Sequence, residues 1–207
     1  MIAIAADDRL APLARANALG YLDKYKDGRA VTALISGAKS EHPAIRAVAV
    51  ATLGLVGHNA VEGAAVRAAI LAALGDSRRA VRLSALTSLI NGGGGEFPPE
   101  DWDRFHRVSR EFITMAQLYR DDAGNQRALG IVHLLVGESD LAAEALQISL
   151  GLEADGTSVK FLLALARLAQ QRFSEARALL AQVPPSDPFY AIAQERLKML
   201  EPTAAPK

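Results

Sequence analysis

Cysteine is missing from the 207 residues of this chain, and aromatic residues make up only 5% of it. Without thiols the sequence has no disulfide, no thiolate nucleophile, no zinc–thiolate or iron–sulfur ligand and no Cys-x-x-Cys-His attachment of a c-type haem. Long apolar runs are missing too, because Arg, Asp, Glu or Lys interrupts every hydrophobic stretch before the roughly 18 to 20 residues that a membrane helix needs. The sequence therefore predicts no membrane span.

An excess of charge of one sign is also absent. The chain carries 23 Lys and Arg against 23 Asp and Glu. Residues 1–95 hold 11 basic and 7 acidic side chains, and residues 96–207 hold 12 and 16. Nucleic-acid-binding domains gather Lys and Arg into a basic face, which this scatter does not provide. We expect no nucleic-acid partner.

The residue patterns of common catalytic and metal sites are not found. His42, His58, His106 and His133 lie far apart, with no i, i+4 pair and no His-Glu-x-x-His motif. No serine stands in a Gly-x-Ser-x-Gly elbow. We therefore predict that the protein is not an enzyme and holds no metal ion or cofactor.

What the chain does contain is a set of small and apolar residues that occurs twice at a 34-residue offset. The first copy is Leu129-Gly130, Ala142 and Leu146, and the second is Leu163-Ala164, Ala176 and Leu180. Repeats of this period are built from helical hairpins that bury their apolar faces only by stacking on one another. The sequence predicts an all-α fold, an alpha-solenoid of stacked helical hairpins.

A different pattern repeats in the first half, where an Arg follows a turn. Arg15, Arg46 and Arg82 each stand near the start of an Ala-rich amphipathic stretch. Pro12 and Pro43 suit the first turn of two of these helices, where a backbone N–H is not needed. Short amphipathic helices of this kind bury their apolar stripes by stacking on neighbours.

This pattern resembles HEAT-type repeats over about residues 7–91, as in Arg46-Ala47 with Leu53-Gly54 and in Arg15-Ala16 with Leu19-Gly20. The recurring Arg has two interpretations. It contacts phosphate groups of a ligand, or it satisfies carbonyls or an Asp in the adjacent turn, as the resemblance implies. We favour the structural interpretation.

A Gly-rich and Pro-rich stretch at 92–99 separates the two patterns, and neither helix nor strand tolerates it. No strand precedes its glycines and no Gly-Lys-Ser/Thr follows, so a linker is favoured over a phosphate-binding loop. We therefore expect HEAT-like helical repeats at 1–91, a linker at 92–99, a linker helix with TPR-like repeats and a capping helix at 100–200, and a flexible tail at 201–207.

The 34-residue pattern resembles tetratricopeptide (TPR) repeats, which implies that the first helix of each repeat lines a concave peptide-binding groove. The candidate partner-binding residues on this resemblance are Asn125, Arg127, Ile131, Lys160, Phe161 and Leu165. Ile131 stands where the carboxylate-clamp type of groove has Asn, which disfavours recognition of chaperone tails. Arg127 and Lys160 are candidates for holding an acidic group, and the alternative is that both are solvated surface charges.

The order of HEAT-like units, linker helix and TPR-like units resembles the C-terminal region of certain large bacterial multihaem c-type cytochromes. The stretch Ser77-Arg78-Arg79-Ala80-Val81-Arg82-Leu83-Ser84-Ala85 and the unit at Leu129-Gly130 carry this resemblance. It implies a non-catalytic protein-interaction scaffold or assembly module in a larger electron-transfer complex of the periplasm or cell envelope, with the haem-binding segments outside this chain. Two alternatives stay open: a free-standing cytoplasmic adaptor, if Met1 is the native start, and a small HEAT-like enzyme such as a lyase or modifier.

Overall fold

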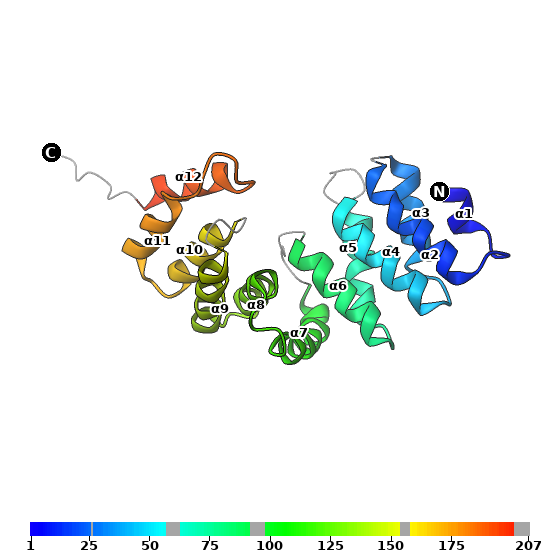
Figure 1. Cartoon of the computed structure of the whole chain (residues 1–207), viewed down its shortest axis with the longest axis horizontal. Coiled ribbons are helices and arrows are strands. Elements are labelled where there is room, and N and C mark those ends of the chain that lie inside the picture. Colours follow the sequence, from blue (N-terminus) through cyan, green and yellow to red (C-terminus); the bar gives the residue numbers. More distant parts are fainter. Residues whose placement is uncertain (26, 57–62, 92–97, 154–157, 201–207) are drawn as a thin grey trace. The chain divides into compact units, whose positions relative to one another are not determined.

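The computed structural model describes residues 1–25, 27–56, 63–91, 98–153 and 158–200 (Figure 1). In these ranges the regular secondary structure is entirely helical, which confirms the predicted all-α class. None of the helices described combines the length and apolar character that a membrane crossing needs. Most of the predicted linker at 92–99 and all of the predicted tail at 201–207 lie outside the described residues.

The chain forms two compact units, Met1–Phe112 and Ile113–Lys207, divided within one helix. The helices of the first unit are α1 (Ile2–Ala6), α2 (Pro12–Gly20), α3 (Gly28–Gly37), α4 (Pro43–Val56), α5 (Gly63–Ala73), α6 (Arg79–Asn91) and the first part of α7 (Trp102–Ala116), with 3-10 helices η1 (Tyr21–Lys24) and η2 (Pro99–Asp101). Helices α2, α4 and α6 pack side by side in one layer. In the other layer α1 packs on α3 and α3 on α5, and consecutive helices from α1 to α6 contact each other.

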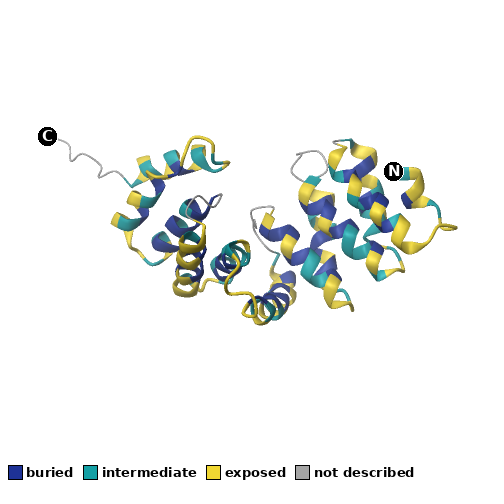
Figure 2. Cartoon of the chain, in the orientation of Figure 1, coloured by how far each residue is buried: buried dark blue, intermediate teal, exposed yellow. Residues whose placement is uncertain are grey.

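Local sequence explains where these helices begin and how closely they meet. Pro12 and Pro43 are the first residues of α2 and α4, as the sequence predicts. Helix α4 contacts α2, α3, α5 and α6, and its apolar residues that face them are buried (Figure 2). Gly54 lies against α6 so closely that an added Cβ would stand 2.6 Å from the side chain of Ser88. The α4–α6 contact therefore depends on a residue without a side chain.

The helices of the second unit are the end of α7, α8 (Ala123–Leu135), α9 (Ser139–Leu152), α10 (Val159–Ala169), α11 (Phe173–Leu180) and α12 (Tyr190–Met199). Each packs on the next from α8 to α12, and α10 also contacts α8. One apolar cluster joins α9 and α10 around Leu146 and Leu163, with Ile131 of α8 packed against it. A second joins α10, α11 and α12 around Phe161 and Leu180.

The turns between α8 and α9 and between α10 and α11 match at the 34-residue offset. Gly137 and Gln171 hold positive φ angles of 81° and 61°. In each turn the next amide donates to a carbonyl five residues earlier, Glu138 to His133 and Arg172 to Arg167, both at 2.8 Å. This is the bond that closes a helix on a left-handed residue, a position that glycine fills without strain.

We expect Gln171→Gly to raise the free energy of unfolding by about 0.5–1 kcal/mol, because a Cβ is disfavoured at this φ. Urea denaturation measures the effect. The matched variant Gly137→Gln should lower stability by a similar amount. If both variants unfold at the wild-type urea concentration, the left-handed turn carries no strain.

Candidate functional site

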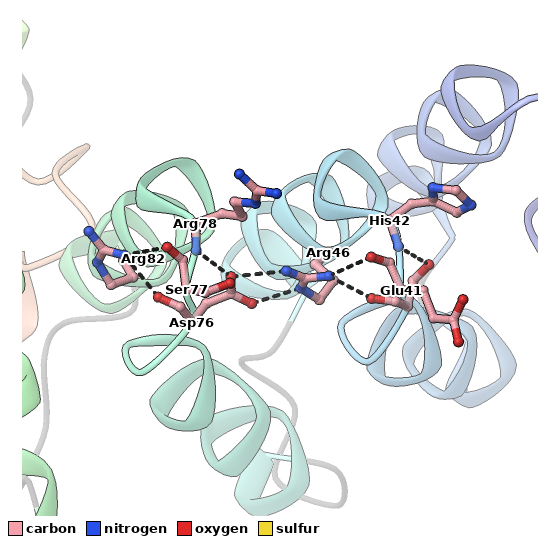
Figure 3. Close-up of polar contacts among 8 residues, drawn as sticks. Glu41, His42, Arg46, Asp76, Ser77, Arg78 and Arg82 are labelled. Carbon is pink, nitrogen blue, oxygen red and sulfur yellow. Dashed lines mark hydrogen bonds and ion pairs between the residues drawn. The ribbon is translucent and has the colours of Figure 1, made fainter.

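Arg46 connects two turns of the first unit, the one before α4 and the one before α6. Its Nε and Nη2 donate to the carboxylate of Asp76 at 2.7 and 3.0 Å (Figure 3). Its Nη1 donates to the backbone carbonyls of Ser40 and Glu41, both at 2.9 Å. One guanidinium thus closes the turn before its own helix and holds an acid from the turn before α6.

Arg82 repeats this arrangement one step along the chain. Its Nη1 donates to the carbonyls of Asp76 and Ser77 at 2.9 and 3.1 Å. Its Nη2 reaches the carboxylate oxygens of Glu111 at 2.8 and 2.9 Å. Both arginines are the fourth residue of their helix, so the side chain lies over the preceding turn.

These contacts confirm the structural interpretation of Arg46 and Arg82 over the phosphate-contacting one. The planar guanidinium fork suits a carboxylate held by two bonds. The Arg46 guanidinium holds the pKa of the Asp76 carboxyl below its usual range, and Asp76 in turn raises the pKa of Arg46. The donors of both side chains are used within the fold.

Four of the six candidate groove residues are engaged inside the second unit. Phe161 is buried and its ring stacks on Phe189 at a centroid distance of 4.8 Å. Ile131 and Leu165 are partly buried against the two apolar clusters. Asn125 donates through Nδ2 to carbonyls at the end of α7 and just beyond it, at 2.8 and 2.9 Å.

Arg127 and Lys160 are placed differently. Both are half-buried, Arg127 on α8 and Lys160 on α10, and these two helices contact each other. In the described part of the chain neither side chain makes a hydrogen bond or ion pair. They are thus candidates for holding an acidic group, and that role stays a prediction.

A polar network at the hairpin turns of this unit escapes the sequence patterns. His133 Nδ1 lies 2.7 Å from a Glu138 carboxylate oxygen. At the position 34 residues later, the buried Arg167 donates to Gln170 at 2.8 Å, and Gln170 donates to Asp140 at 2.7 Å, which ties α10 to α9. His133 and Arg167 stand 34 residues apart, and this offset is the one sequence signal that connects the two sets of contacts.

Metal binding gains no support from the geometry, since the described residues contain no group of three or more His, Cys, Asp or Glu arranged to hold an ion. The segment Gly57-His58-Asn59 lies outside the described residues.

No protein-family model matches this chain, and no curated protein matches it. The HEAT-like and TPR-like assignments, and the likeness to multihaem cytochromes, therefore stay predictions from the sequence.

Proposed function

We propose that this protein is a non-catalytic interaction scaffold, a solenoid of HEAT-like hairpins followed by TPR-like hairpins, and that its second unit binds an acidic peptide segment. Arg127 and Lys160 carry the proposal, because they are half-buried cations on two contacting helices without a polar partner among the described residues. The buried cation of the same unit, Arg167, is paired: its Nε lies 3.3 Å from Glu175.

Partial burial is what favours a ligand over simple solvation at these two residues. A fully exposed ion pair contributes little, since water screens it and the side chains lose entropy. A charge that has already lost part of its water gains more from a carboxylate at short range. Ile131 lies one turn after Arg127 on the same face of α8 and offers an apolar contact beside the charge.

The proposal predicts that the double variant Arg127→Glu and Lys160→Glu binds a fluorescein-labelled Asp/Glu-rich decapeptide about tenfold to a hundredfold more weakly than the wild type. Fluorescence anisotropy at low and at physiological salt measures the loss. The matched Asn/Gln decapeptide should not bind.

The control is Lys198→Glu, which reverses an exposed charge on α12 of the same unit. It should leave the affinity unchanged, and circular dichroism should show that each variant folds. Equal affinity of the wild type and the double variant contradicts the proposal and makes the first unit the better candidate for partner binding.

A further inference from the structure

Ser40 in the turn before α4 occupies the same structural position as Asp76 in the turn before α6. Each side chain accepts a hydrogen bond from the backbone N–H two residues later, at 3.3 and 2.8 Å. Each backbone carbonyl accepts from Nη1 of the arginine six residues later, Arg46 or Arg82, at 2.9 Å. The two turns make matching hydrogen bonds, and the first of them carries a hydroxyl where the second carries a carboxylate.

Arg15 of α2 corresponds to Arg46 of α4. Because Ser40 has a hydroxyl, the turn before α4 supplies no carboxylate to Arg15, whereas Asp76 in the turn before α6 supplies one to Arg46. Arg15 donates through Nε to the Ala5 carbonyl at 3.0 Å, and its Nη1 lies 2.6 Å from Asp8. The Arg15 and Arg46 side chains are equally covered, each 15% exposed. Their acids are not, since the Asp8 side chain is 86% exposed and that of Asp76 is 13% exposed. The ion pair of Arg15 with Asp8 is therefore open to solvent on the side of the acid.

A cleft of about 690 Å³ lies between Arg15 and the turn at Ser40. Its lining comes from α1, α2, α3, α4 and the α1–α2 and α3–α4 turns, all within the first unit. Lys39 and His42 also line it. The cleft therefore lies beside Ser40, the residue whose equivalent in the turn before α6 is Asp76, which supplies a carboxylate to Arg46.

We propose that this cleft binds a carboxylate of an acidic side chain from a partner polypeptide. The carboxylate contacts the Nη atoms of Arg15, because Nε of Arg15 already donates to the Ala5 carbonyl. The equivalent Arg46 and Arg82 both hold carboxylates, and the guanidinium fork matches that group. Asp8 and Glu41 also line the cleft and oppose a doubly charged phosphate. Asp8 acts as an internal competitor that the incoming carboxylate displaces. This site is separate from the one at Arg127 and Lys160, and each stands without the other.

The test follows the Arg15 Nε–Hε resonance of the full chain, labelled with ¹⁵N, during titration with acetyl-Gly-Glu-Gly-amide. A saturable shift is expected, and acetyl-Gly-Gln-Gly-amide should give none. Asp8→Asn removes the competitor and should tighten binding several-fold. Arg15→Gln should abolish peptide-induced shifts of the backbone amides around the cleft.

Ser40→Asp provides the sharpest control, because it places a built-in carboxylate where Asp76 stands in the next turn. We expect it to raise the melting temperature and to abolish the titration. The proposal is overturned if the wild type and Asp8→Asn show no saturable shift, if Ser40→Asp binds the glutamate peptide as the wild type does, or if inorganic phosphate binds more tightly than that peptide.

Discussion

Replacing Arg46 by alanine is expected to lower the free energy of unfolding by about 1.5–3 kcal/mol, the range for hydrogen bonds to a charged group, because its ion pair with Asp76 is partly buried. Asp76 then keeps its charge in a site where only 13% of its side chain meets solvent. The carbonyls of Ser40 and Glu41 lose their donors in the same step. Urea denaturation at pH 7 measures the loss, with the reversibility of unfolding checked for both proteins.

The exposed pair of Asp27 and Arg29 gives the matched control. The Arg29 side chain is 84% exposed and reaches only a carboxylate two residues away on its own turn. Arg29→Ala should therefore unfold at the wild-type urea concentration, because water replaces such a contact. If Arg46→Ala and Arg29→Ala lower the free energy of unfolding equally, the contacts of Arg46 with the turns before α4 and α6 do not stabilise the unit.

The same ion pair sets part of the pH dependence of stability. The hydrogen bonds from Arg46 lower the pKa of Asp76 in the folded state. The ion pair therefore contributes fully to the free energy of unfolding above the unfolded-state pKa of Asp, about 4. This contribution is lost as the pH falls through the lower pKa of Asp76 in the folded state. The stability difference between wild type and Asp76→Asn should thus be constant at neutral pH and shrink below about pH 4. A difference that stays the same down to pH 2 contradicts this.

The helical class and the first residues of α2 and α4 follow from the sequence because they depend on local chemistry. Proline at a first helical position and apolar residues at helical spacing act within one helix, whatever covers it. Gly130 and Ala164 are small residues at the same 34-residue offset. The turns at Gly137 and Gln171 show this offset in the structure as well. These signals need no knowledge of the tertiary partner.

The direction of the candidate site residues depends on what packs beside them, and the sequence pattern does not contain that information. Arg127 and Phe161 stand 34 residues apart, at matching positions of α8 and α10. Phe161 nevertheless lies in the core, because Phe189 at the start of α12 stacks on it. The TPR-like pattern predicts which residues are equivalent, and the neighbouring helix decides which of them are exposed.

The contacts of Arg46 and Arg82 could be predicted from the sequence only in part. An Asp six residues before an Arg occurs at Asp76 and Arg82, and the same spacing has Ser40 before Arg46. The spacing alone does not say that Asp76 pairs with Arg46 of α4. That pairing joins residues 30 positions apart, and it follows from the way α4 and α6 lie side by side.

Gly130→Ala should lower the free energy of unfolding by about 1–3 kcal/mol, although alanine is the better helix former by about 1 kcal/mol. The added Cβ would stand 2.4 Å from Cγ of Leu146 and 2.8 Å from one of its methyl groups. Helices α8 and α9 must then separate or Leu146 must leave its rotamer. In the second hairpin Ala164 and Leu180 hold the matching positions, both fully buried, so the two crossings are spaced for different side chains.

Gly151→Ala is the matched control, because nothing lies within 4 Å of the Cβ it adds near the end of α9. It should leave stability unchanged or raise it by up to about 1 kcal/mol through helix propensity alone. In the Gly130→Ala background, Leu146→Ala should cost less than it does in the wild type, since the shorter side chain removes the clash. Additive effects of these two changes would mean that the hairpin absorbs the new methyl group without contact, and that Gly130 does not set the distance between α8 and α9.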